Sequence, residues 1–127
     1  MHELALCEAV LATALDVSGG RPVQRLRVRV GQLQGVLPES WGMCWQMVSM
    51  NGPAAGSTVD LDEVPARVVC RACGAETTPP SAPFACRACA ATTVEVVQGE
   101  ELLLEEVEVE GGEVLRNPRL PVEEVSR

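Results

Sequence analysis

The sequence predicts an α+β fold: a small mixed sheet with two helices, interrupted by an inserted lobe that is built on four cysteines. Apolar residues recur at helical spacing in two segments and alternate with polar residues in several others, which indicates helices and half-buried strands. Two Cys-x2-Cys pairs stand between two of the alternating segments. A chain of 127 residues holds one sizeable hydrophobic core, so the cysteine lobe needs another source of stability.

A first helix is expected over residues 4–18, where apolar side chains repeat every three or four positions. Ser18-Gly19-Gly20 ends it, because glycine readily adopts the left-handed conformation that caps a helix. Cys7 falls on the apolar side, so we interpret it as a buried structural thiol. The apolar stripe consists of Leu4, Cys7, Leu11 and Leu15.

Residues 23–30 alternate cleanly and predict a half-buried strand. Leu26, Val28 and Val30 point one way, and Arg25, Arg27 and Arg29 point the other way. The arginines could form an anion site. The favoured interpretation pairs them across the sheet with carboxylates such as those at 105–110.

A second helix is expected from Pro38, whose fixed φ suits a first turn, to the stop signal Asn51-Gly52-Pro53. Two apolar rows follow its helical period, and Cys44 lies between them. The methionine row could indicate an adaptable or soft-metal surface, but core filling is the favoured prediction. One row is Trp41, Trp45 and Val48, and the other is Met43, Met47 and Met50.

Further strands are expected over 57–64, 67–69, 93–97 and 101–110. The last one contains a phase slip, because Leu102 and Leu104 have one parity and Val107 and Val109 have the other. One strand cannot bury both sets on the same face without a bulge, which we predict near Glu105-Glu106. We therefore divide the chain into residues 1–66, an inserted lobe at 67–94, and a return strand with a C-terminal tail at 95–127.

The strongest motif consists of four cysteines: Cys70, Cys73, Cys86 and Cys89. Two Cys-x2-Cys pairs separated by twelve residues are typical of a structural zinc site, so the inserted lobe resembles a zinc ribbon. The lobe has too few large apolar residues to fold by burial alone, and zinc can contribute about 10–16 kcal/mol. A rubredoxin-like iron site and a nucleic-acid ribbon are the alternatives, disfavoured by scarce aromatics and by the acidity of the chain.

The only histidine is His2. An exposed, idle side chain is the ordinary interpretation of a histidine at this position. The chemistry also allows a chelate from the α-amine of Met1, the deprotonated amide and ring nitrogens of His2, and a further amide or the Glu3 carboxylate. Such planar N/O coordination suits Ni(II) or Cu(II).

Composition excludes several function classes. The net charge of -8 and the 2% aromatic content disfavour nucleic-acid binding, and no segment is long and apolar enough to span a membrane. A single terminal histidine and the absence of lysine leave no catalytic triad and no Walker A motif, so we predict that the protein is not an enzyme. The expected location is the cytoplasm, where cysteines serve metals more often than disulfides.

Several short motifs occur together in a specific order along residues 1 to about 110. They are Met1-His2-Glu3-Leu4, Val28-x-Val30-Gly31, Pro38-Glu39, the two cysteine pairs and Gly99-Glu100-Glu101-Leu102. In this order and spacing the chain resembles the HypA/HybF family of nickel chaperones for [NiFe]-hydrogenase maturation. The leading hypothesis is therefore a nickel metallochaperone, and a zinc-ribbon adaptor that binds protein or nucleic acid is the alternative.

The resemblance implies that Ni(2+) binds through His2, nearby backbone nitrogens including that of Met1, and, in some members, Glu3. It implies a structural Zn(2+) on the four cysteines and an inserted zinc domain. The implied partners are a HypB-type GTPase and the hydrogenase large subunit, and some members also serve urease. A homodimer is possible but not decided by the sequence. The chain departs from the family pattern in lacking a second histidine and a glycine after Cys89.

Overall fold

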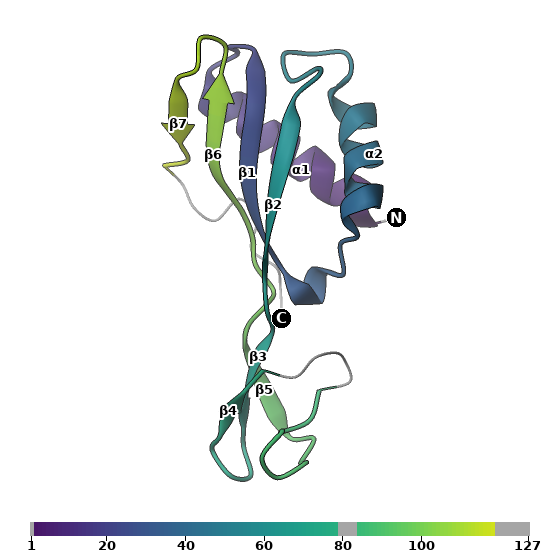
Figure 1. Cartoon of the computed structure of the whole chain (residues 1–127), viewed down its shortest axis with the longest axis vertical. Coiled ribbons are helices and arrows are strands. Elements are labelled where there is room, and N and C mark those ends of the chain that lie inside the picture. The colour runs from purple at the N-terminus through teal and green to yellow at the C-terminus, as the bar shows by residue number, and fades with distance from the viewer. Residues whose placement is uncertain (1, 79–83, 119–127) are drawn as a thin grey trace.

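The computed structural model describes residues 2–78 and 84–118 as two α-helices, one 3-10 helix and seven strands. They form two lobes, stacked along the long axis of the molecule (Figure 1). The elements are α1 (His2–Ser18), β1 (Val23–Gly31), η1 (Gln32–Gln34), α2 (Pro38–Ser49), β2 (Thr58–Val64), β3 (Arg67–Cys70), β4 (Glu76–Thr77), β5 (Val94–Gln98), β6 (Leu102–Val109) and β7 (Val114–Arg116).

The larger lobe contains a mixed four-stranded sheet in the order β2-β1-β6-β7. Strand β1 pairs in parallel with β2 and antiparallel with β6, which in turn pairs antiparallel with β7. The second lobe contains a three-stranded sheet in the order β4-β3-β5. The α+β prediction with a mixed sheet and two helices is therefore confirmed.

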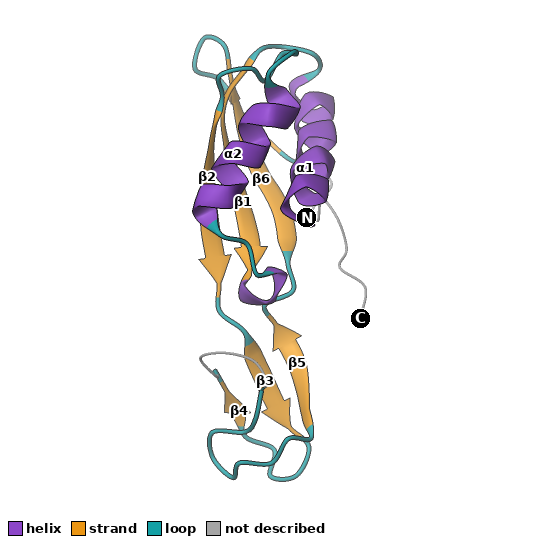
Figure 2. Ribbon diagram, turned by 90° about the vertical axis from the view of Figure 1, so that its right-hand side faces the viewer, coloured by secondary structure: helices purple, strands orange, loops and turns teal. Residues whose placement is uncertain are grey.

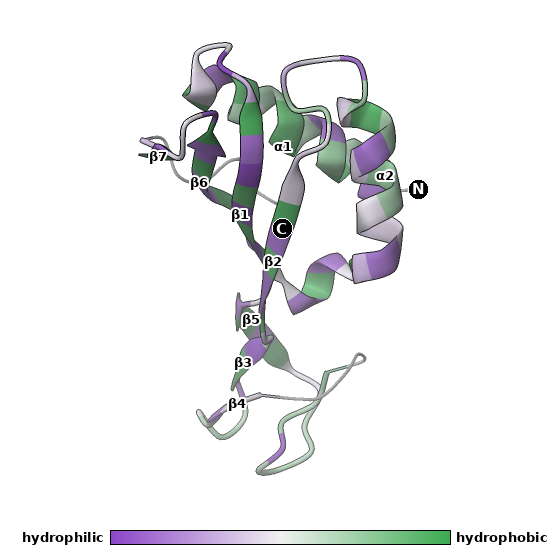
Figure 3. Ribbon diagram, turned by 45° about the horizontal axis from the view of Figure 1, so that its top comes forward, coloured by the Kyte–Doolittle hydropathy of each residue, from purple (hydrophilic) through white to green (hydrophobic). Residues whose placement is uncertain are grey.

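Both helices cover one face of the larger sheet (Figure 2). The alternation of β1, visible in Figure 3, sends Leu26, Val28 and Val30 into the core, where each is at most 3% exposed. A fully buried leucine or valine stabilises the fold by about 1.5–3 kcal/mol. Helices α1 and α2 pack on these side chains and on each other, which closes a core that needs no contribution from the cysteine lobe.

The row of α2 that contains the tryptophans is buried as predicted, whereas the methionine row is exposed. Trp41 and Trp45 are buried, and Cys44 is 7% exposed. The prediction that the methionines fill the core is wrong, because Met43 and Met47 are 68% and 61% exposed. The two tryptophans and Cys44 already fill the space beneath α2, so the adjacent row faces away from the sheet.

A bulge in β6 confirms the predicted phase slip. Arg27 pairs with Glu106, whereas Val28 pairs with Leu104, so Glu105 is the extra residue. The bulge restores the parity, because Leu104 and Val107 are then both fully buried. Asn117 binds this region through hydrogen bonds from its side-chain amide to the Leu104 carbonyl (2.9 Å) and from its backbone N–H to the Glu105 carbonyl (3.0 Å).

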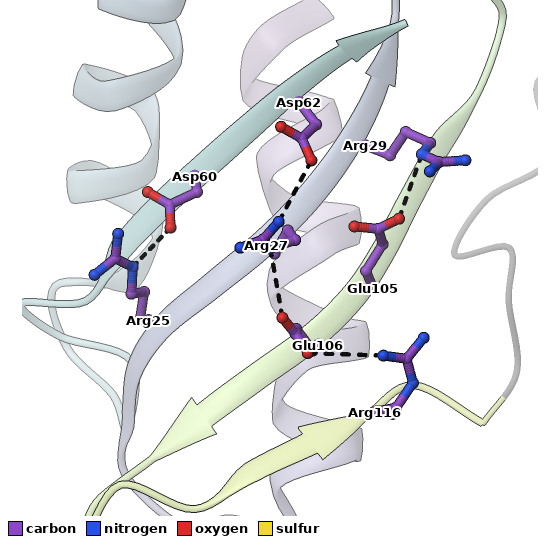
Figure 4. A network of polar contacts seen from close by, with 8 residues as sticks. All are labelled: Arg25, Arg27, Arg29, Asp60, Asp62, Glu105, Glu106 and Arg116. Carbon is purple, nitrogen blue, oxygen red and sulfur yellow. Dashed lines mark hydrogen bonds and ion pairs between the residues drawn. The ribbon is translucent and has the colours of Figure 1, made fainter.

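The open face of the sheet carries a row of ion pairs (Figure 4). Arg27 lies between Asp62 (3.7 Å) and Glu106 (3.4 Å), and Arg29 contacts Glu105 at 3.3 Å. The predicted pairing with the carboxylates at 105–110 is confirmed for these two arginines. Arg25 instead pairs with Asp60 on β2, at 2.6 Å. Exposed ion pairs of this kind contribute about 0–1 kcal/mol each to stability. Because carboxylates already pair with these arginines, the row does not favour the alternative of an anion site.

The two lobes meet at a neck, which we define as Gly31, η1, Ala66 and Gly99. The backbones approach so closely that a Cβ on Gly31 would lie 2.0 Å from the Gly99 carbonyl oxygen. The Gly31 N–H donates to the Glu101 carbonyl, and the Leu33 N–H donates to the Gly99 carbonyl, both at 2.8 Å. This interlock fixes where the chain leaves the larger sheet and where it returns.

Some elements were not expected from the sequence. These are the short strands β4, between the two cysteine pairs, and β7, in the C-terminal segment after Gly111. Residues 79–83, between the two cysteine pairs, and the tail from residue 119 onward lie outside the described residues. Neither helix within 2–78 and 84–118 has the length and hydropathy that a membrane crossing requires.

Replacing Gly31 by alanine should destabilise the protein by about 3 kcal/mol, because the added methyl group meets backbone that cannot move aside. Gly42→Ala is the matched control, since a Cβ there meets nothing within 4 Å in the middle of α2. The control should gain about 0.5–1 kcal/mol from helix propensity. Chemical denaturation of the zinc-loaded protein measures both changes, and equal stabilities for the two variants would contradict the close approach.

Candidate metal sites

The four cysteines lie on two matching knuckles at the far end of the three-stranded sheet. In the first knuckle, the backbone N–H groups of Ala72 and Cys73 donate to the Cys70 sulfur at 3.3 and 3.4 Å. In the second knuckle, Ala88 and Cys89 donate to Cys86 in the same way, at 3.3 and 3.4 Å. The sequence repeat Cys-x2-Cys therefore produces a repeated local geometry.

The sulfur atoms converge on one point. Sγ of Cys70 lies 3.6 Å from Sγ of Cys89, and Sγ of Cys73 lies 3.7 Å from Sγ of Cys86. All four ligand atoms lie within 4.8 Å of one another. Four thiolates around a zinc ion at the usual bond length stand about 3.8 Å apart, so the donor set fits a closed tetrahedral zinc site.

Hydrogen bonds prepare two of the thiols for metal binding. The backbone N–H of Cys73, helped by that of Ala72, lowers the pKa of Cys70 to about 7 from an ordinary value of 9.0. The backbone N–H of Cys89 likewise lowers the pKa of Cys86. Zinc binds thiolates, so one sulfur of each knuckle is predisposed to ligate. A closed shell of four thiolates has no open position for a reacting water, so the zinc that it would hold is structural.

The two knuckles differ in the residue that follows the second cysteine. Gly74 has a φ of +78°, and Ala90, at the corresponding position, has a φ of +69°. The left-handed conformation costs a non-glycine residue about 1–2 kcal/mol. The second knuckle, which has no glycine after Cys89, therefore contains a strained alanine in a turn that otherwise matches the first.

The start of helix α1 lies on the larger lobe, beside α2 (Figure 1). Helix α1 begins at His2. The Glu3 carboxylate accepts a long hydrogen bond (3.5 Å) from the Leu37 N–H, so it joins the start of α1 to the start of α2. Met1 and the His2 side chain lie outside the described part of the structure, and the nickel ligands remain a prediction.

The other two cysteines form no part of the thiolate cluster. Cys7 is fully buried, as predicted, and its thiol lies 3.8 Å from the Trp41 carbonyl. Burial, together with neighbouring Cys44 and the acidic Glu3 and Glu8, raises the pKa of Cys7 to about 12. The thiol therefore stays protonated, and Cys7 packs α1 against α2 instead of binding a metal.

A family profile described as "Hydrogenase/urease nickel incorporation, metallochaperone, hypA" matches residues 1–109. The chain belongs to the HypA family. Hydrogenase maturation factor HypA of Nostoc sp. is 31% identical over 110 residues, which cover 87% of this chain and 96% of that protein. The HypA of Geobacter metallireducens is 33% identical over 110 residues, covering 87% of this chain and all of that protein.

Solved structures of HypA proteins have the same fold. The solution structure of the Ni metallochaperone HypA from Helicobacter pylori aligns with a TM-score of 0.59 at 15% identity, covering 84% of this chain and 96% of that chain. A second HypA solution structure aligns with a TM-score of 0.54 at 18% identity, covering 86% of this chain and 96% of that one. The predicted HypA/HybF resemblance is confirmed.

The chain is a metallochaperone of the hydrogenase nickel-incorporation family, which is a maturation factor and not an enzyme. This membership favours the nickel hypothesis over the zinc-ribbon adaptor. The family binds nickel and zinc, and the four-cysteine cluster at Cys70, Cys73, Cys86 and Cys89 fits the zinc.

Ala90→Gly should stabilise the second knuckle by about 0.5–1 kcal/mol, since relief of the left-handed strain outweighs the entropy of the added glycine. Gly74→Ala, which places alanine in the same conformation in the first knuckle, should lose a similar amount. Competition with a chelator, followed by a zinc-sensitive dye, measures how tightly each variant holds zinc. The idea fails if the two substitutions shift zinc retention in the same direction.

Cys73→Ser should release zinc and unfold the three-stranded sheet, while the larger lobe keeps its own core. Hydrogen exchange should show lost protection in β3 and β5 and retained protection in β1 and β6. Ala72→Ser, a polar change at an exposed position of the same knuckle, is the control and should keep one zinc per chain. Wild-type protection throughout a zinc-free Cys73→Ser protein would show that the zinc is dispensable.

Proposed function

We propose that the protein binds Ni(II) at its N-terminus and delivers it to the large subunit of a [NiFe]-hydrogenase during maturation. Membership of the HypA family supports nickel handling in general. The observation that carries the specific proposal is the start of α1 at His2, directly after Met1. The proposed ligands therefore occupy a helix N-terminus, whose backbone nitrogens differ chemically from those inside a helix.

The first N–H groups of a helix have no intrahelical acceptor. Deprotonation of the His2 amide therefore breaks no helical hydrogen bond, and the positive end of the helix dipole favours the resulting negative charge. In our proposal the ligands are the Met1 α-amine, the amide and ring nitrogens of His2, and the Glu3 carboxylate. This set supplies the planar nitrogen and oxygen coordination that suits Ni(II).

The two metals have different roles in this proposal. Nickel is the cargo, held at a chain end where a recipient can replace the ligands one at a time. Zinc, held by Cys70, Cys73, Cys86 and Cys89, would join two knuckles of a lobe that lacks a large apolar core. The helical lobe would then collect and release nickel, while the zinc lobe, an inserted domain at residues 67–94 between 1–66 and 95–127, stays folded.

The partners that we propose follow from the family. A HypB-type GTPase would act with this protein in nickel delivery, the hydrogenase large subunit would receive the metal, and urease is a further candidate recipient. We place these events in the cytoplasm, where a reducing environment keeps the four cysteines available as thiolates. A homodimer, in which two N-termini handle nickel, is compatible with the proposal.

Nickel titration of tag-free, zinc-loaded protein tests the proposal. We expect one nickel per chain, and we expect His2→Ala or acetylation of the N-terminus to abolish this binding while the zinc content stays unchanged. Glu8→Gln, which removes a carboxylate one to two turns further along α1, is the matched control and should bind nickel normally. Calorimetry with zinc analysis measures both metals.

The same titration repeated across pH adds an independent test of His2. Neutral imidazole is the ligand, so nickel affinity should fall as the pH drops through the reference histidine value of about 6.5. Nickel affinity that survives both the His2→Ala change and the N-terminal block would move the site elsewhere. An affinity that is flat from about pH 8 to about pH 5.5 would exclude ligation by the imidazole.

A further inference from the structure

Exposed apolar side chains concentrate on one helix. Six large apolar side chains are exposed among the residues that the structure describes, and four of them belong to α2 or to the residues at its two ends. Their exposed fractions are 62% for Leu37, 68% for Met43, 61% for Met47 and 62% for Met50. Met43 and Met47 are one turn apart and form a ridge along the outer side of α2.

A groove runs between this ridge and α1. Its cavity volume is about 580 Å³, and its lining residues recur along α1 at helical spacing from Leu4 to Leu15. Eleven steps along a helix correspond to about 16 Å, or three turns. The groove is lined by Leu4, Glu8, Leu11, Ala12, Leu15, Met47 and Val48.

The groove lies on a helical face that carries only negative charges. Glu8 lines it, and the other two carboxylates of α1, Glu3 and Asp16, lie elsewhere on the same helix. No lysine or arginine occurs anywhere in residues 2–20 or 32–66, which include both helices. Arg25, Arg27 and Arg29 lie on the opposite face of the sheet, where carboxylates engage them. The helical face is therefore both apolar and negatively charged.

We propose that the groove between α1 and α2 binds a basic amphipathic helix of a partner protein, about three turns long. Apolar side chains of that helix would pack on Leu11, Leu15 and Met47, and an arginine or lysine would face Glu8. A helix suits the groove because helices alone form its walls, and a third helix can pack on two neighbours. The flexible methionine ridge can adapt to the side chains that it meets.

The position of the groove connects it with the metal cargo. Its first lining residue, Leu4, directly follows the proposed nickel ligands Met1, His2 and Glu3. A helix that fills the groove would therefore place one end beside those ligands. The inference rests on the proposed function and deepens it. Docking of the partner helix would serve the transfer of nickel to or from that partner.

A synthetic peptide tests the groove directly. The probe is a fluorescent 14-residue peptide with leucines at helical spacing and arginines along both flanks, and the matched peptide has glutamates in place of the arginines. Anisotropy with zinc-loaded wild-type protein should show binding of the basic peptide only, weakened by added salt. Equal binding of both peptides, or of neither, would overturn the proposal.

Three variants locate the binding site. Met47→Glu should weaken the basic peptide at least tenfold, and Glu8→Arg should reverse the preference between the two peptides. Val97→Glu makes the same kind of change at an exposed apolar residue of the other lobe and should leave binding unchanged. Wild-type affinity in both groove variants would overturn the proposal. So would a homodimer, seen by sedimentation, that Met47→Glu dissociates, because the groove would then be the interface between two copies.

Nickel titration of the same variants separates this inference from the proposed function. Met47→Glu and Glu8→Arg should bind one nickel like the wild type, since neither changes a proposed ligand. Wild-type protein that binds the basic peptide but no nickel would refute the nickel proposal and leave the groove in place. Wild-type protein that binds nickel but not the peptide would refute the groove alone.

Discussion

The contact between two backbones at the neck decides how the rest of this molecule is arranged. Gly31 ends the central strand of the larger sheet against the carbonyl of Gly99, at a distance that no side chain could occupy. Gln32 and Gln34 extend the contact, since the Gln32 side chain accepts from the Ala66 N–H and the Gln34 side chain donates to the Glu100 carbonyl, both at 2.8 Å. The outgoing and returning chains are thereby held together where one sheet gives way to the other.

The two lobes on either side of the neck depend on different physics. The larger lobe has a conventional core, in which two helices bury the inner residues of β1 and β6. The smaller lobe has two hydrogen-bonded knuckles and four converging sulfur atoms, so we expect its stability to depend on a metal. Loss of metal is therefore expected to affect the lobes unequally. Such a division suits the carrier that we propose, whose cargo would lie on the self-sufficient lobe.

Sequence periodicity predicted most of the fold, because buried elements repeat every two or about 3.6 residues. The cysteine spacing predicted the thiolate cluster for an equally local reason. Strand β7 and the contacts of Asn117 escaped prediction, since short elements acquire their structure from distant neighbours. Met43 and Met47 show the limit of periodicity: a helix with two apolar rows does not reveal which row meets the sheet when bulky tryptophans in one row already fill the space. The prediction of the nickel ligands comes from the chemistry of the N-terminal residues and from family membership.

The bulge at Glu105 has a consequence for how chains of this family can diverge. Before the bulge the even-numbered residues Leu102 and Leu104 face the core, and after it the odd-numbered residues Val107 and Val109 do. Deleting one residue there would turn one half of the strand inside out and detach the carbonyls that Asn117 engages. Insertions and deletions in β6 should therefore survive evolution only in compensating pairs or with a rewritten apolar pattern. Strand length in homologues would then record the bulge even where the residues around it have changed.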